Sequence, residues 1–217
     1  MDALRHRHAD LTWAPFLAVY VGCTGLAAGV WKYAGLATAA FCVIYTLAKT
    51  VMLWGAWFRW GSSPLLDRAS RRFAGAAILA GVANGLAWIA YFFAFQRGPL
   101  ALVQTVTAMS SVVAAVLTAL FLRERVASTQ LAGVVMVIVA SLLLGYLEAG
   151  TGGGARHRGW LLASFTSAAL WGASSALAKY AYGLPGAGDI RMNLGQWAGF
   201  VVTVLPYGLW LAPVEPW

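Results

Sequence analysis

Lys49 is the residue whose type and position most clearly call for a chemical explanation. It lies inside the apolar stretch LAKTVMLWGAWF (47–58). A charged side chain inside a membrane-crossing segment is costly to bury, and such residues commonly bind a substrate or an ion. Alternatively, the long side chain extends toward the membrane surface near Arg59, about 15 Å further along a helix. The sequence leaves both interpretations open.

A second group of candidates combines amides, hydroxyls and aromatic rings. Asn84 lies between Gly81 and Gly85, a spacing typical of two closely packed helices, so its amide either bonds the neighbouring helix or contacts a substrate. Hydroxyl and amide residues also form a polar stripe in 99–121, for packing or for lining a cavity: Gln104, Thr105, Ser110 and Ser111. Four aromatic residues either wall a cavity or lie in the belts at the membrane surface: Trp54, Trp88, Tyr91 and Trp171. The substrate-cavity candidates are therefore Lys49, Asn84, Trp88, Tyr91, Gln104, Ser110 and Trp171.

Acidic residues are missing from the interiors of the apolar segments. The nearest ones lie in the breaks or at segment ends: Asp67, Glu124, Glu148 and Asp189. Proton coupling through an intramembrane carboxylate is therefore unsupported. Because the deep charge is positive, we hypothesise a substrate with an anionic or zwitterionic part, such as an amino acid or another metabolite.

The chain also lacks the motifs of common enzymatic chemistries. It contains no H-E-x-x-H, no paired carboxylates, no G-x-S-x-G and no P-loop. Cys23 and Cys42 fall inside apolar runs, and no Cys/His cluster has the spacing of a zinc site. We therefore predict a protein that is not an enzyme, uses no ATP, and holds no metal or cofactor.

The composition indicates an integral membrane protein. Of its 217 residues, 61% are hydrophobic and only 10% are charged, whereas soluble domains average about 25% charged residues. The net charge of +8 is explained by cationic loops beside membrane spans rather than by nucleic-acid binding. The expected partners are the lipid bilayer and a small-molecule substrate, with no nucleic acid.

The elements that carry these residues are predicted to be transmembrane helices. A spanning helix needs about 20 mostly apolar residues. Seven segments qualify: 12–31, 36–58, 73–96, 99–121, 128–147, 159–181 and 193–212. They are long and rich in Ala, Gly and Leu, without the alternation of barrel strands. The predicted fold class is therefore an all-α integral membrane protein.

Lysine and arginine in the loops predict the orientation. With a cytoplasmic N-terminus, most basic loop residues lie on the inner side, as the positive-inside rule requires. We therefore predict a multi-pass protein of the inner or plasma membrane. The residues expected to anchor helix ends at the membrane surface are Lys32, Lys179, Arg123, Glu124 and Arg125.

The first and sixth segments resemble each other at an offset of 147 positions. Trp13 and Gly25 match Trp160 and Gly172, and Lys-Tyr-Ala at 32–34 matches the same tripeptide at 179–181. The second copy comes five predicted spans after the first, so it enters the membrane from the opposite side. Inverted repeats of this kind are typical of transporters. Glycines expected at close helix contacts are Gly25, Gly81, Gly85, Gly133 and Gly172.

Residues 84–146 resemble the drug/metabolite transporter superfamily, EamA type. The matching features are an aromatic third span with Tyr91 and Ala94, a short turn, a fourth span of small and branched residues that begins near Ala101, and the stretch RERVASTQLAG (123–133). The family usually has a proline in the middle of the fourth span, where this chain reads AMSSVV (108–113). The kink that the resemblance implies there is therefore left open.

The resemblance implies ten spans in two five-span halves. Residues 1–148 would form the first half, 149–158 a glycine-rich connecting loop, and 159–217 two helices of a second half. The chain is then either truncated or a reduced form that pairs with a second copy or with a separate second-half chain. The implied function is a secondary transporter, an exporter of small metabolites or drugs that works by alternating access. The alternatives are a flippase of lipids or lipid-linked sugars, and a truncated, non-transporting membrane protein.

Overall fold

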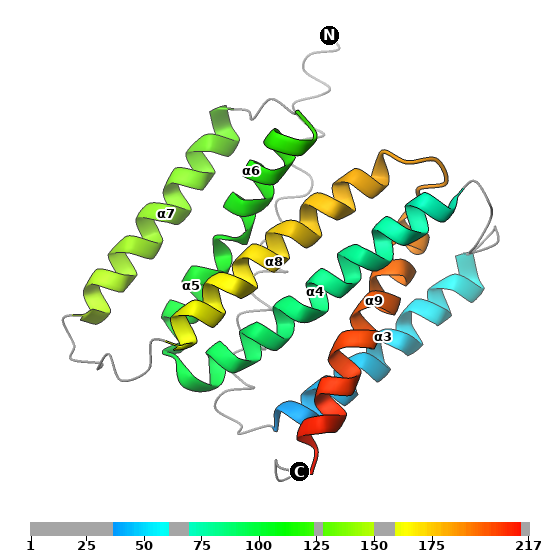
Figure 1. The fold of residues 1–217 in the computed structure, drawn as a ribbon, viewed down its shortest axis with the longest axis horizontal. Coiled ribbons are helices and arrows are strands. Elements are labelled where there is room, and N and C mark those ends of the chain that lie inside the picture. The colour runs from blue at the N-terminus through cyan, green and yellow to red at the C-terminus, as the bar shows by residue number, and fades with distance from the viewer. Residues whose placement is uncertain (1–36, 61–69, 124–127, 150–158, 214–217) are drawn as a thin grey trace.

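The computed structural model describes residues 37–60, 70–123, 128–149 and 159–213 (Figure 1). All elements in these ranges are helices, as the sequence predicts. Their bounds are α3 Thr38–Trp60, α4 Arg71–Arg97, α5 Leu100–Ala108, α6 Ser110–Phe121, α7 Ser128–Ala149, α8 Gly159–Tyr182 and α9 Asp189–Leu211.

Five stretches in the described ranges are long and apolar enough to cross a membrane. They are Thr38–Gly55 in α3, the whole of α4, α5 and α6 together, α8, and α9. These correspond to five of the seven predicted spans. The first predicted span, 12–31, lies outside the described residues. Helix α7 covers the predicted span 128–147, but its described apolar part is the shorter stretch Leu131–Ala140. A total of seven spans therefore stays a prediction.

Helix α4 is the central element of the bundle. It packs along α8 on one side and α9 on another, while α3 packs on α9 and α5 and α6 pack on α8 (Figure 1). Helix α8 runs antiparallel to α4, because Trp171 bonds Asn84 and the later Ser174 bonds the earlier Ala80. Helix α9 runs parallel to α4, because Gly195 meets Ala77 and Gly199 meets Val82.

Glycine permits the close approach of α4 and α9. A Cβ atom added at Gly81 would collide with the backbone of Gln196, and one added at Gly199 would collide with the carbonyl oxygen of Ile78. Gly85 lies equally close to the side chain of Thr203. Both helices therefore carry a G-x-x-x-G pair at the same contact. In a membrane, where burial from water does not drive helices together, this backbone proximity supplies the van der Waals contact that holds them.

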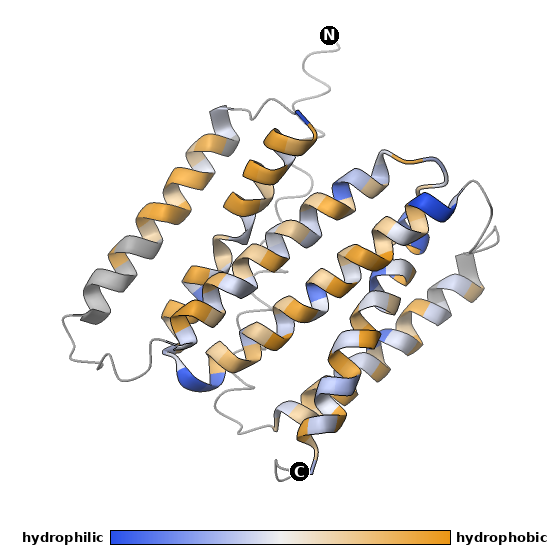
Figure 2. Cartoon of the chain, in the orientation of Figure 1, coloured by the Kyte–Doolittle hydropathy of each residue, from blue (hydrophilic) through white to orange (hydrophobic). Residues whose placement is uncertain are grey.

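The apolar side chains divide between the interior and the outer surface. A buried cluster of large side chains includes Phe92, Phe95, Val103 and Phe200. Many other large apolar residues are exposed, such as Val51, Leu120, Met136, Leu162 and Val202. Figure 2 shows hydrophobic colour in every helix and hydrophilic colour at both ends of α4. This distribution fits helices whose outer faces contact lipid and whose ends lie in water.

The fourth span is broken although it has no proline. Helix α5 ends at Ala108 and α6 begins at Ser110, with Met109 between them. The Met109 amide donates to Val106, three residues back rather than four. The Thr107 hydroxyl lies 2.9 Å from the carbonyl oxygen of Val103 and 3.0 Å from that of Gln104. Hydroxyls that bond the preceding turn bend helices. The fourth span is thus interrupted at the place where the resemblance implies a kink, without a proline.

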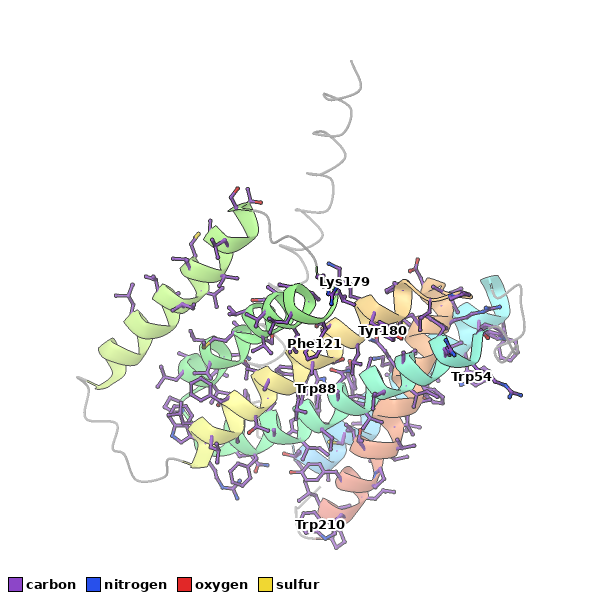
Figure 3. The ribbon with its side chains drawn as sticks, turned by 45° about the horizontal axis from the view of Figure 1, so that its top comes forward. Trp54, Trp88, Phe121, Lys179, Tyr180 and Trp210 are labelled. Carbon is purple, nitrogen blue, oxygen red and sulfur yellow. The ribbon has the colours of Figure 1, made fainter. Side chains whose placement is uncertain are left out.

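Helix α7 stands apart from the rest of the bundle. It packs mainly on α5, and Figures 1 and 3 both show it separated from α4, α8 and α9. Several of its large apolar side chains are exposed, including Leu131, Val135, Met136 and Leu143. This helix therefore has little part in positioning the interior residues discussed below.

Candidate functional site

One face of α4 carries three of the predicted cavity residues. Asn84, Trp88 and Tyr91 recur at intervals of four and three, so their side chains leave α4 on the same side. Tyr91 is buried, and Asn84 and Trp88 are half-buried. Asn84 is near the midpoint of α4, so this face places polar groups deep in the apolar layer.

Two hydrogen bonds connect this face to neighbouring helices. The indole nitrogen Nε1 of Trp171 on α8 donates to Oδ1 of Asn84 at 2.9 Å. The amide nitrogen Nε2 of Gln104 on α5 donates to the Tyr91 hydroxyl at 2.7 Å. Each bond uses only part of the side chain's capacity, because an amide has two donors and an acceptor oxygen. In the described part of the chain, neither amide makes a further hydrogen bond, which leaves capacity for a ligand.

Aromatic contacts complete the group. The Trp88 ring lies 5.7 Å from the Tyr91 ring and 5.5 Å from the Trp171 ring, both nearly perpendicular. The Tyr91 and Trp171 rings are 5.4 Å apart. Figure 3 places Trp88 in the middle of the bundle. We call Asn84, Trp88, Tyr91, Gln104 and Trp171 the α4 cluster. The structure brings these five predicted residues together.

Lys49 is connected to the α4 cluster through an aromatic ring. Its ammonium nitrogen Nζ lies 5.9 Å from the centroid of the Tyr45 ring and 5.4 Å from that of Phe200 on α9. The Tyr45 ring in turn lies 5.8 Å from the Trp88 ring. Both distances from Nζ fall within the range of cation–π attraction, about 6 Å. Tyr45 and Phe200 were not among the sequence candidates, although Tyr45 precedes Lys49 by one helical turn.

Ser167 of α8 carries a buried hydroxyl and was not among the sequence candidates. It is fully enclosed, and its oxygen has no hydrogen-bond partner among the described residues. Buried polar atoms nearly always have a partner, so an unpaired one points to a ligand or a water molecule. Ser167 precedes Trp171 by one turn and therefore lies on the same face of α8. No sequence pattern distinguishes it from Ser164, whose hydroxyl bonds the Trp160 carbonyl oxygen.

Two predicted aromatic or polar candidates lie outside the cluster. Trp54 contacts Phe58 and Trp197 instead of the cluster rings, and Figure 3 places it well away from Trp88. Ser110 is the first residue of α6, and its backbone oxygen lies where α6 approaches Gly172 of α8. In the described structure, no hydrogen bond joins Ser110 to the cluster.

The glycines predicted at helix contacts take different positions. Gly81 and Gly85 face α9, and Gly172 faces Val113 and Ser110 of α6. Gly133 on α7 is exposed, and a Cβ atom there would meet nothing within 4 Å in the described part of the chain. Gly25 lies outside the described residues. The α9 pair, Gly195 and Gly199, was missed although its spacing repeats that of Gly81 and Gly85.

The predicted anchors can be placed only in part. Lys179 is exposed in the last turn of α8, and Arg123 is exposed just after α6. Lys32, Glu124 and Arg125 lie outside the described residues. In addition, Arg97 at the end of α4 lies over the Phe93 ring at 3.7 Å, a contact suited to the membrane surface.

Among the described residues, no three His, Cys, Asp or Glu side chains gather as metal ligands would. The prediction that the protein holds no metal or cofactor stays a prediction. The cluster instead offers amides, hydroxyls and ring faces, which suit an organic molecule.

Comparison with known families decides what kind of protein this arrangement belongs to. The profile of the EamA-like transporter family matches residues 11–146, well over half of the chain. The chain belongs to the EamA-like transporter family. Searches of curated proteins and of solved structures each found no match. As an EamA-like protein with several apolar helices, the chain is a multi-pass membrane transporter of the drug/metabolite type. Members of this family are transporters, which agrees with the prediction that the protein is not an enzyme.

Proposed function

We propose that this EamA-like protein is a secondary transporter that exports small metabolites or drugs across the inner or plasma membrane by alternating access, without ATP. The α4 cluster carries the proposal. Asn84 and Trp171 bond each other near the midpoints of their helices. Secondary transporters bind their substrates near the bilayer midplane, between helices that later move apart.

The broken fourth span supports the same proposal. Discontinuous helices are a recurring feature of transporter sites, because they free backbone groups and allow one half to move against the other. Here the break at Met109 lies on the same span as Gln104, five residues after it, and Gln104 bonds Tyr91. The α5 half bonds the cluster, while the α6 half packs on α8 beside Gly172. Movement of α6 relative to α5 would therefore open or close one side of the cluster.

The predicted inverted repeat has support from one contact. The indole nitrogen of Trp197 donates to the Thr50 hydroxyl at 3.0 Å, and these residues are 147 positions apart. The same offset relates the Lys-Tyr-Ala copies at 32–34 and 179–181. If the offset of 147 extends without a gap to the second and seventh predicted spans, Thr50 and Trp197 are equivalent residues, and such residues meet each other only near the pseudo-two-fold axis that relates the repeats. This contact favours an axis between α3 and α9.

The helix directions support the predicted alternation of spans. Helix α8 is antiparallel to α4, and α9 is parallel to it. An even number of membrane crossings must therefore separate α4 from α8. The α5–α6 pair supplies one crossing, so α7 would supply the other. With the cytoplasmic N-terminus that the basic residues indicate, α4 and α9 would run outward and α8 inward.

Transport by the purified chain in liposomes tests the proposal. Vesicles are preloaded with unlabelled amino acids, organic acids, nucleosides or organic cations, and entry of the labelled compound by exchange is measured without ATP. We expect exchange of at least one class above protein-free vesicles. A chain that moves only a fluorescent lipid between leaflets would be a flippase. That result, or no exchange for any class by folded protein, would contradict the proposal.

A further inference from the structure

Lys49 faces the interior of the bundle rather than the lipid. The buried residues of α3 include Cys42, Thr46 and Leu53, which recur with Lys49 at intervals of four, three and four. Residues at these intervals share one face of a helix. The opposite face carries exposed side chains such as Val51. The sequence left open whether Lys49 faces the bundle interior or extends to the membrane surface. The packing favours the interior.

The ammonium group also points away from the C-terminal end of α3, where Arg59 lies. It lies over the Tyr45 ring, one turn toward the start of the helix, as helical side chains generally do. Arg59, toward which the side chain would have to extend to reach the surface, lies in the opposite direction. Lys49 is at the midpoint of α3, about 16 Å from either end. The ammonium group is therefore directed into the apolar layer and away from the lipid headgroups.

The surroundings of the ammonium group offer ring faces but no counter-ion in the described structure. Asp189, an acidic side chain that the structure describes, begins α9 and accepts a hydrogen bond from Tyr182. It lies eleven residues before Phe200, about 16 Å along the helix. Ring faces attract a cation but accept few of its three N–H donors. An anion would complete the site.

We propose that Lys49 is the anion-recognition residue of the transport site and that its ligand is the carboxylate group of a small organic acid, with or without an amino group. This inference rests on the proposed transport function. A carboxylate matches the single charge of Lys49. A phosphate carries roughly two negative charges at neutral pH, and the described arginines lie at helix ends. The ring series Tyr45, Trp88 and Trp171 then provides an apolar wall for the rest of the molecule.

A series of phenyl compounds that differ only in charge tests the proposal by binding. Phenylacetate, phenylalanine, 2-phenylethanol and 2-phenylethylamine are titrated by calorimetry into the full chain in vesicles of phosphatidylcholine. We expect the two carboxylates to bind and the amine not to bind. Lys49→Met should weaken phenylacetate binding by about 30-fold or more, because one partner of a desolvated charge pair is removed. Lys49→Arg should retain most of the binding.

Two further variants make the result specific to charge at this position. Lys49→Glu should reverse the preference, so that 2-phenylethylamine binds and phenylacetate does not. Lys179→Met, at the exposed end of α8, removes the same charge elsewhere and should bind phenylacetate like the parent chain. Thermal unfolding of each variant shows whether it is folded. Methionine removes the cost of burying the ammonium group of Lys49. The Lys49→Met variant should therefore unfold at the same temperature as the parent or at a higher one.

The contrary outcomes separate this inference from the proposed function. Unchanged phenylacetate binding in folded Lys49→Met, or selective transport of 2-phenylethylamine by the parent chain, would overturn the carboxylate site while leaving a transporter. A Lys49-dependent interaction with phosphatidylglycerol, or with inorganic phosphate in place of phenylacetate, would also overturn it. Absence of any transport by folded protein would instead remove the proposed function.

Discussion

Replacing Gly199 of α9 by alanine is expected to force α4 and α9 apart and to lower the free energy of unfolding by about 2–3 kcal/mol. The added Cβ atom would overlap the carbonyl oxygen of Ile78 and lie 2.5 Å from the amide nitrogen of Val82. Overpacking of a close contact typically costs about 1–3 kcal/mol. The upper part of that range applies here because both obstacles are helical backbone, which cannot rotate away. Gly81→Ala should behave similarly, since its Cβ atom would meet the backbone of Gln196.

The matched control lies on α4, the helix against which Gly199 packs. Gly75 of α4 has nothing within 4 Å of its added Cβ position. Gly75→Ala should therefore be neutral or stabilising by up to about 1 kcal/mol, since alanine favours the helix. Unfolding of the solubilised variants by heat or by detergent titration gives the comparison. Equal stability of Gly199→Ala and Gly75→Ala would show that α4 and α9 do not pack as described.

Truncation of Trp88 to alanine is expected to be the most damaging single change at the candidate site. Its ring contacts five other rings, at centroid distances between 5.4 and 6.1 Å: Phe41, Tyr45, Tyr91, Phe92 and Trp171. Large-to-small core changes of this kind cost about 3–5 kcal/mol. In a membrane, most of this cost comes from the lost packing and the cavity. Transfer of the side chain out of the interior contributes little, because lipid is as apolar as the interior. We expect a loss of about 3 kcal/mol and no measurable transport.

Two companion variants separate packing from binding at this position. Trp210 is exposed and its ring contacts only Tyr207 among the described aromatic residues, so Trp210→Ala should cost less than about 0.5 kcal/mol. Trp88→Phe keeps a ring in the cluster and should retain most of the stability. If the ring wall contacts substrate, Trp88→Phe still lowers the transport rate several-fold. Full transport by folded Trp88→Ala would exclude the cluster as the site.

The helices could be predicted from the sequence, but their pairing could not. Segments 73–96 and 159–181 are recognisable because about 20 apolar residues suffice to cross a bilayer. Nothing in that pattern says that Trp171 bonds Asn84, 87 positions earlier. Helix contacts in membranes depend on shape and a few polar groups rather than on apolar periodicity. The spacing of Gly195 and Gly199 repeats that of Gly81 and Gly85. This sequence feature could have identified α9 as a partner of α4.

Rotation of the helices about their own axes explains the remaining differences at the site. Trp54 was grouped with Trp88 and Trp171 by residue type, but α3 directs it toward Trp197. A helix that is apolar on all sides gives no pattern that indicates its interior face. The break at Met109 was equally hidden, because no proline marks it in the sequence. Lys49 was the exception, since a charge in an apolar segment is evident from sequence alone.

Alternating access to the α4 cluster is the central claim, and the reactivity of a single cysteine at position 167 tests it most directly. The chain with Ser167→Cys, Cys23→Ser and Cys42→Ala is reconstituted in vesicles and treated with a membrane-impermeant maleimide added outside or trapped inside. Ser167 is enclosed in the described structure, so reagent reaches it only when one side of the bundle opens. The account predicts labelling from both sides, slowed in each case by a transported substrate. Labelling from one side only, or none from either side while a Lys179→Cys control reacts, would contradict it.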